Sequence, residues 1–209
     1  MPFGITSFDE LNKMVGVKRS LPFEEYFRPM KISEKQKKER MRLARLLEEE
    51  FLYMMSYMFY AYPTINMDMA NELRERYIRQ LELLGIATTA AKAQAAKFAI
   101  EAVESTQRHK EDPYFYSEDR ARLCAEDQSC FVGDINDYAD ALDGGKGFKT
   151  WQTVGDNRVR FSHEEVEGLT LPIEEPFELA GGLLQYPHDS SWGCDPSEIS
   201  GCRCTLSYS

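Results

Sequence analysis

Hydrophobic positions recur at helical spacing over much of residues 33–145. A long helix is predicted from Ser33 to about Tyr62, because Ser33 and Gln36 have capping-box spacing and Pro63 ends the pattern. Three further helices are predicted over 67–84, from Thr88 or Thr89 to about His109, and from Ser117 to Gly144-Gly145. Residues 1–32 resemble an arm with short amphipathic pieces at 8–14 and 23–27, whose aromatic side chains should pack on the chain itself or on a neighbouring subunit.

The pattern changes after Gly147. Residues 148–153 alternate and are rich in aromatics and threonine, which predicts a strand, and shorter strands are predicted at 169–173 and 183–186. A second capping-box pair, Ser162 and Glu165, predicts a short helix over 163–167 that Gly168 ends, and residues 196–199 are predicted to form a turn. The fold class is therefore α+β, with an N-terminal α-helical region followed by a small C-terminal α+β domain with few short strands. The break at Glu111-Asp112-Pro113 predicts domains at 1–112 and 113–209.

The second half of the first long helix, around Phe51 to Phe59, is apolar on nearly all faces. Such a helix is either the centre of a core or a docking surface for a partner, and aromatic residues at helical spacing favour the core. The apolar run from Phe51 to Tyr62 is too short and too polar to cross a bilayer, which needs about 20 residues. No membrane span is expected.

The formal net charge of −10 argues against a general nucleic-acid binder. Residues 1–110 are nevertheless slightly basic, whereas residues 111–209 are strongly acidic. The basic start of the long helix is a candidate partner-binding face, formed by Lys35, Lys37, Lys38 and Arg40. The five cysteines are an odd count, and no secretory signal is expected, so reduced thiols or a metal site are favoured over disulfides.

Residues 149–204 hold two of the three histidines, both tryptophans and three of the five cysteines. Three interpretations compete for this stretch. In the first it forms a zinc site, with candidate ligands His163, His188, Cys202 and Cys204. Cys-x-Cys is tighter than the common ligand spacing, which weakens this interpretation.

The second interpretation is catalysis by an acid/base pair drawn from Asp156, His163, Glu164, His188 and Asp189. No nucleophile elbow or phosphate loop accompanies these residues. The third is a tied-down structural module, in which Arg158, Arg160 and Arg203 pair with acidic residues (Asp156, Glu164, Glu174, Glu175) around a small core of Trp151, Phe161, Phe177 and Tyr186. This third interpretation is favoured. Cys124 and Cys130 are expected to be small buried residues.

The same stretch resembles the phage Mu F-like minor head protein family. The resemblance rests on the order of five motifs: Lys149-Thr150-Trp151, Asp156-Asn157-Arg158-Val159-Arg160-Phe161-Ser162-His163, Gly168-Leu169-Thr170-Leu171-Pro172-Ile173-Glu174-Glu175-Pro176-Phe177, Tyr186-Pro187 and Cys202-Arg203-Cys204. It covers about residues 115–206. This chain departs from the family in having Gly201 where many members have asparagine, and Arg160-Phe161-Ser162-His163 where some have Cys-x2-Cys.

The resemblance implies a non-enzymatic, low-copy virion protein that associates with the portal and assists head morphogenesis or genome delivery. It implies contacts with portal protein and with scaffold or major capsid protein, inside the head near the portal, and residence in the host cytoplasm during assembly. Contact of the basic start of the long helix with packaged DNA is a separate hypothesis from the charge distribution. No cofactor comes with the family, and zinc stays a candidate through His163, Cys202 and Cys204. The alternative function is a metal-dependent enzyme or toxin-like effector using His163, Glu164 and His188.

Overall fold

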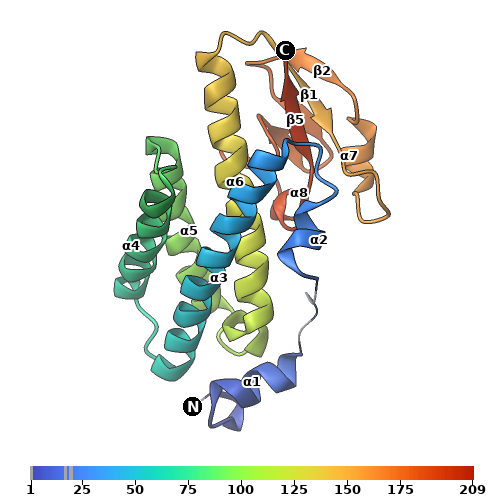
Figure 1. Ribbon diagram of the computed structural model, residues 1–209. Coiled ribbons are helices and arrows are strands. Elements are labelled where there is room, and N and C mark those ends of the chain that lie inside the picture. The colour runs from blue at the N-terminus through green and yellow to red at the C-terminus, as the bar shows by residue number, and fades with distance from the viewer. Residues whose placement is uncertain (1, 17, 19–20) are drawn as a thin grey trace. The chain divides into compact units, whose positions relative to one another are not determined.

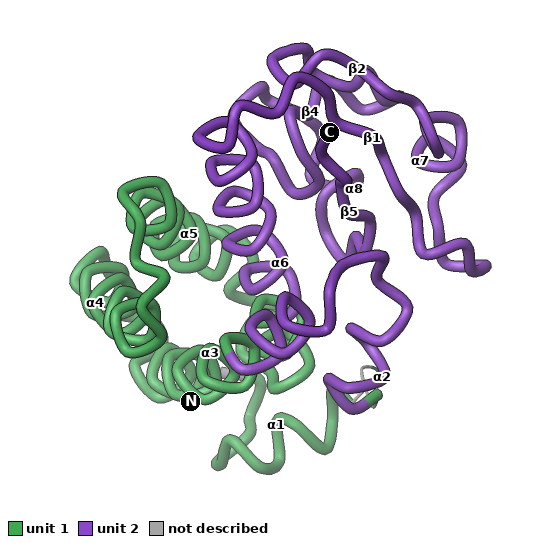
Figure 2. The backbone as a smooth tube through the Cα atoms, turned by 45° about the horizontal axis from the view of Figure 1, so that its top comes forward, with its two compact units in different colours: residues 1–21, 43–125 green, residues 22–42, 126–209 purple. Residues whose placement is uncertain are grey.

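The structure is a computed structural model that describes residues 2–16, 18 and 21–209. It confirms the α+β class: long helices dominate, and the described strands are short and antiparallel (Figure 1). The chain forms two compact units, and each is built from two separate segments (Figure 2). Unit 1 comprises residues 1–21 and 43–125, and unit 2 comprises residues 22–42 and 126–209.

The α-helices of the first 143 residues begin and end close to the predicted positions, whereas the two short 3-10 helices were not predicted. Their bounds are η1 Pro2–Gly4, α1 Phe8–Val15, α2 Phe23–Phe27, α3 Glu34–Ala61, α4 Met67–Leu84, α5 Thr89–Arg108, η2 Pro113–Tyr116 and α6 Glu118–Asp143. At the start of α3 the Ser33 hydroxyl accepts a hydrogen bond from the backbone N–H of Gln36. The side-chain oxygen of Gln36 in turn accepts a hydrogen bond from the backbone N–H of Ser33. The capping box is confirmed. Thr88 caps α5, and Gly85 ends α4 in the left-handed conformation with φ of 70°.

Unit 1 has its core on the second half of α3. Phe51, Met54 and Met58 are fully buried there, and the Phe51 ring lies 4.8 Å from the Phe98 ring of α5 and 5.7 Å from the Tyr77 ring of α4. These buried aromatic contacts confirm the core interpretation of this helix half. None of the described helices is long and apolar enough to cross a membrane.

Unit 2 joins a three-stranded sheet to helical segments. Its elements after α6 are β1 Phe148–Gln152, α7 Phe161–Glu165, β2 Thr170–Pro172, β3 Phe177–Leu179, β4 Gly182–Leu184, α8 Pro196–Ile199 and β5 Thr205–Tyr208. Strand β1 lies between β2 and β5 and is antiparallel to both, with Trp151 opposite Leu206, and β3 pairs with β4 as a hairpin. Trp151, Phe177 and Leu184 are fully buried and form the centre of this core.

Aromatic side chains in two segments of the arm pack on the chain itself, as expected. In unit 1 the Phe8 ring lies 6.1 Å from the Phe59 ring. In unit 2 the α2 residues Phe23, Tyr26 and Phe27 are at most 3% exposed. The arm is therefore divided between the units.

The structure divides the chain differently from the predicted cut after residue 112. Asp112 caps a short 3-10 turn, and α6 begins directly after it and continues to Asp143. The limits of the units fall inside α3 and α6, because each of these helices contributes one part to each unit. A proline indicates where the backbone changes direction. It does not indicate in which unit the neighbouring helix is packed.

Some predicted local details are wrong. The short helix begins at Phe161 without a side-chain cap, and the Ser162 hydroxyl donates to Glu198. Phe161 is 74% exposed and is not a core residue. The predicted strand at 183–186 is the β4 strand, which ends at Leu184, while β3 and β5 were not predicted and Pro196–Ile199 forms α8.

Replacement of Gly133 by alanine should destabilise unit 2. A Cβ atom there would lie against the Arg40 guanidinium, 2.7 Å from Cζ, and Arg40 is held by ion pairs to Asp134 and Asp137 and cannot move away. Overpacking costs about 1–3 kcal/mol, which exceeds the gain of up to about 1 kcal/mol from helix propensity. Thermal unfolding should show a lower Tm for Gly133→Ala. The control is Gly147→Ala, where a Cβ meets nothing within 4 Å; equal Tm values for the two variants would contradict the packing.

Candidate functional site

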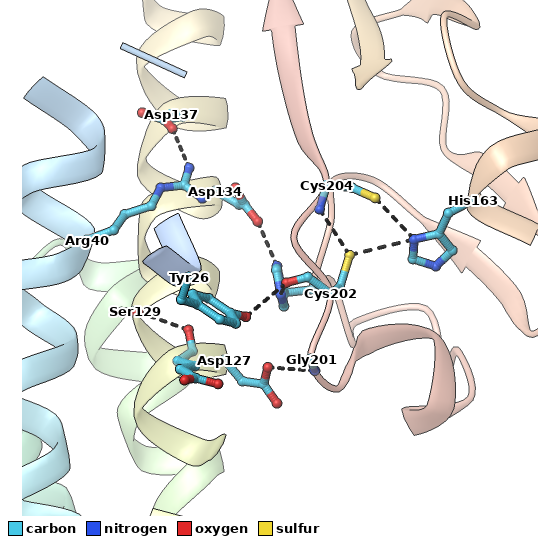
Figure 3. A network of polar contacts seen from close by, with 12 residues as sticks. Tyr26, Arg40, Asp127, Ser129, Asp134, Asp137, His163, Gly201, Cys202 and Cys204 are labelled. Carbon is cyan, nitrogen blue, oxygen red and sulfur yellow. Dashed lines mark hydrogen bonds and ion pairs between the residues drawn. The ribbon is translucent and has the colours of Figure 1, made fainter. Parts of the chain in front are cut away.

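A histidine and two cysteines come together in the interior of unit 2. His163 Nδ1 lies 3.3 Å from Cys204 Sγ and 3.6 Å from Cys202 Sγ, and all three ligand atoms lie within 4.8 Å of one another. The three side chains are between 1% and 3% exposed. Figure 3 shows both sulfur atoms directed at the imidazole ring. The structure thus brings three of the four predicted metal-ligand candidates together.

Local structure explains why these three residues meet. His163 lies on α7, which follows the turn after β1, and its ring packs nearly perpendicular to Trp151 with the centroids 5.4 Å apart. Cys202 and Cys204 lie directly before β5, which pairs with β1. Gly201 has a φ of 68°, which favours glycine and turns the chain into the Cys202-Arg203-Cys204 segment.

Glu198 orients the histidine, and sequence analysis did not identify this residue. Its Oε2 atom lies 3.0 Å from His163 Nε2 and accepts a hydrogen bond from the Ser162 hydroxyl at 2.8 Å. A carboxylate beside Nε2 favours a proton on that nitrogen, and Nδ1 is the ring nitrogen that faces the sulfurs. The prediction of a turn at 196–199 gave no reason to place this carboxylate in the core.

The backbone around Cys202 is fixed from several directions. The Cys202 carbonyl accepts hydrogen bonds from His188 Nε2 at 3.0 Å and from the Tyr26 hydroxyl at 3.4 Å. The Gly201 amide donates to Asp127 Oδ1 at 2.7 Å, and the Cys204 amide donates to Cys202 Sγ at 3.4 Å. Figure 3 shows the contacts of Tyr26 with Cys202 and of Asp127 with Gly201. The two thiols are therefore held in place by partners from α2, α6 and the preceding loop.

His188, the fourth predicted ligand, is not part of the group. Its Nδ1 atom lies 2.8 Å from Asp134 Oδ2 and its Nε2 atom donates to Cys202, so both ring nitrogens are engaged. Burial alone would lower the pKa of His188, but the hydrogen bond to Asp134 and the surrounding acidic groups raise it to about 9. The ring is a protonated structural tie near neutral pH. The prediction that His188 is a metal ligand is therefore wrong.

Arg40 shares the same carboxylate and is also a structural residue. Its NH1 atom lies 2.8 Å from Asp134 Oδ1, and its NH2 atom lies 2.7 Å from Asp137 Oδ2 (Figure 3). Arg40 is 3% exposed. Burial alone would lower the pKa of Arg40, but these carboxylates raise it above its usual range. The prediction that Arg40 belongs to an exposed partner-binding face is therefore wrong, because the residue is buried.

The other motif residues build the surroundings of the site. Arg203 contacts both Asp156 oxygens at 2.8 Å, one contact of the kind predicted between the three arginines and the acidic residues, while Arg160 donates to the Ser200 carbonyl. Arg158 is exposed and donates its backbone amide to Asp156. Of the remaining motif residues, Trp151, Phe177, Tyr186 and Pro187 are buried, whereas Gly168 and Pro172 are exposed. Gly168 has a φ of 75° that favours glycine at the end of its turn.

A small cavity adjoins the histidine and both cysteines. Its volume is about 10 Å³, and Arg158 and Arg160 are among its lining residues. A space of this size accommodates about one water molecule. The group can therefore meet a single solvent-sized ligand from this side.

The two candidate acid/base histidines contact carboxylates that the prediction did not include. Glu164 is exposed, whereas His163 contacts Glu198 and His188 contacts Asp134. Asp189 accepts hydrogen bonds from the Gln185 amide at 3.0 Å and from Ser191. These hydrogen bonds connect segments of unit 2 to one another. Of the two predicted cysteines outside the stretch, Cys130 is buried as expected, and Cys124 is only half-buried.

The stability of unit 2 should fall at alkaline pH through His188. A folded-state pKa raised from 6.5 to about 9 gives a contribution that is fully present below pH 6.5 and is lost as pH rises through 9. The stability advantage of the wild type over His188→Asn should thus shrink by on the order of 2–3 kcal/mol across this window. Asparagine suits the position because it tolerates the φ of 66° found at His188. Chemical unfolding at pH 6 and pH 9.5 measures the gap, and a pH-independent gap would contradict the assignment.

Comparison with known proteins does not extend the site. The chain matches no protein-family model, no curated protein and no solved structure. The resemblance to Mu F-like minor head proteins therefore stays a prediction from the ordered motifs. What the geometry itself establishes is a buried His-Cys-Cys group with an orienting carboxylate, held by a network of buried charges.

Proposed function

We propose that the protein is a phage minor head protein: a low-copy virion component that associates with the portal and assists head morphogenesis or genome delivery without enzymatic activity. The observation that carries the proposal is the order of motifs from Lys149 to Cys204, which resembles that family. Its place in this proposal is inside the head near the portal, and in the host cytoplasm during assembly.

The internal use of the motif side chains supports this proposal. Trp151 and Phe177 pack in the core of unit 2, Arg203 is bound to Asp156, and His163 is bound to Glu198. Side chains that are packed in the core or hydrogen-bonded within the domain stabilise its fold and are not available to a substrate. A shape-maintaining module is what an assembly protein requires, since its work is done through its surfaces.

The candidate contact surface for portal protein narrows to two lysines at the start of α3. Lys35 is 84% exposed in its side chain and lies 3.8 Å from Glu39, and Lys38 is also exposed. Lys37 is held by Glu34 and the Arg28 carbonyl, and Arg40 is buried. Lys35 and Lys38 are therefore the residues of the predicted patch that are best placed to meet an acidic surface on portal, scaffold or major capsid protein, or the phosphates of packaged DNA.

The alternative function is less well supported by the geometry. A metal-dependent enzyme or toxin-like effector would need His163, Glu164 and His188 to act at one place. His163 contacts Glu198, His188 contacts Asp134 and Glu164 is exposed, so the three residues have different surroundings and different partners. The minor head proposal does not depend on any of the three being chemically free.

Charge reversal of the exposed lysines should weaken binding to the portal protein encoded in the same phage genome. The double variant Lys35→Glu/Lys38→Glu replaces attraction by repulsion, so its Kd should rise at least about tenfold at low salt, and the loss should diminish as salt screens the charges. The matched control is Lys110→Glu/Lys146→Glu, which makes the same charge change at two other exposed lysines. Calorimetric titration of full-length proteins provides the measurement.

Equal affinities of the two double variants would rule out this contact surface. The wider proposal is tested by mass spectrometry of purified virions. A few copies of the chain per particle, together with defective or empty heads when its gene is deleted, are expected. Normal yields of infectious particles that lack the chain would overturn the minor head assignment.

A further inference from the structure

The two nitrogen–sulfur distances within the His-Cys-Cys group are close to those between ligands of one tetrahedral metal ion, and all three ligand atoms lie within 4.8 Å of one another. A zinc ion with Zn–S of about 2.3 Å and Zn–N of about 2.0–2.1 Å places its nitrogen and sulfur ligands about 3.6 Å apart. His163 Nδ1 lies 3.6 Å from Cys202 Sγ and 3.3 Å from Cys204 Sγ. Metal coordination therefore needs only small side-chain shifts from the positions in the structure.

The histidine is already oriented as a ligand. In metal sites, the nitrogen that does not bind the ion usually donates to a carboxylate or a carbonyl, which fixes the tautomer and the ring plane. Glu198 occupies that position at 3.0 Å from Nε2, and it is fixed in turn by the Ser162 hydroxyl. Glu198 is 7% exposed, so its carboxylate is held in the interior for this contact.

The cysteines are held in the same way. The Cys204 amide donates to Cys202 Sγ at 3.4 Å, and the Cys202 carbonyl is fixed by His188 and Tyr26. Hydrogen bonds to a ligating sulfur stabilise its negative charge. A binding loop held by the surrounding fold also loses little conformational entropy when it takes up an ion.

The cavity beside the group offers the place for a fourth ligand. It is lined by all three ligand residues, and its volume of about 10 Å³ accommodates one water molecule. Arg158 and Arg160 also line this cavity, which favours a water-derived or other small anionic ligand there. Three protein ligands and one solvent ligand complete a tetrahedron.

We propose that His163 Nδ1, Cys202 Sγ and Cys204 Sγ bind one zinc ion, with Glu198 as a positioning residue and a solvent-derived fourth ligand in the adjoining cavity. Two thiolates and an imidazole are a donor set that suits zinc, and two thiolates balance its charge. The ion would join α7 to the segment before β5. This proposal is independent of the minor head proposal, since the site would tie the same fold together in a protein of any function.

The chain supplies matched controls for the ligands. Cys194 is 6% exposed and belongs to the same hydrophobic core, yet it is outside the His-Cys-Cys group. Cys194→Ser thus makes the same chemical change as Cys202→Ser at a comparable burial. For the orienting carboxylate, Glu198→Gln keeps the shape and a hydrogen-bond acceptor but removes the charge.

The experiment is a titration of Co²⁺ into full-length, reduced protein from which metal has been removed by a chelator. Wild type and Cys194→Ser should bind one equivalent and develop the visible bands of tetrahedral cobalt together with a sulfur-to-cobalt charge-transfer band. Cys202→Ser, Cys204→Ser and His163→Ala should lose these bands. Competition with a chromophoric zinc chelator should show roughly 10–100-fold weaker zinc affinity for Glu198→Gln.

Circular dichroism of each metal-free variant separates loss of ligand from loss of fold. A variant with wild-type helix content that does not bind cobalt supports the assignment, and His163→Gln provides a milder replacement if His163→Ala unfolds. The proposal would be overturned if the folded wild type took up no cobalt or zinc. It would be overturned equally if folded Cys202→Ser bound cobalt with the wild-type spectrum, because the ion would then have other ligands.

Discussion

One buried carboxylate, that of Asp134, underlies the arrangement of unit 2. It lies 2.8 Å from Arg40 on one side and 2.8 Å from His188 on the other, and all three side chains are at most 3% exposed. Burying a charge in a protein interior is costly unless it is paired, and two cations around one carboxylate, with Asp137 as the second partner of Arg40, satisfy this requirement. The first turns of α3, the middle of α6 and the loop after β4 are thereby joined through a single group.

The same network reaches the candidate metal site in one further step. His188 uses its second ring nitrogen to hold the Cys202 carbonyl. Asp127 on α6 holds the Gly201 amide (Figure 3). The position of the cysteines therefore depends on charges buried on α6, and the position of the imidazole depends on Glu198 of α8. Packing of Trp151 against His163 completes the surroundings from the sheet.

Signals that act within a few residues were readable from the sequence, and pairings between distant residues were not. The capping box at Ser33, the threonine cap before α5 and Gly85 after α4 each act over one helical turn, and the helices they predict are present. Arg40 and Asp137 are 97 residues apart, so a lysine- and arginine-rich helix start was interpreted as one exposed patch. Glu198 and β5 were missed for the same reason: their partners, His163 and β1, are brought near only by the tertiary fold. The sequence identified four candidate metal ligands because histidine and cysteine are rare, and three of them come together in the structure. His188 could not be excluded from sequence alone, because its exclusion depends on its contact with Asp134.

The most direct test of this account is the unfolding free energy of Asp134→Asn compared with that of Asp137→Asn. The first substitution leaves two buried cations without their shared carboxylate, so it should cost about 3–5 kcal/mol. The second affects a carboxylate that is 24% exposed in its side chain and pairs with one cation, Arg40, beside a hydrogen bond with Gln36, so its cost should be clearly smaller. A larger loss for Asp134→Asn is the predicted result. Equal losses, or a loss for Asp134→Asn below about 1 kcal/mol, as is typical of surface ion pairs, would contradict the central role of this carboxylate.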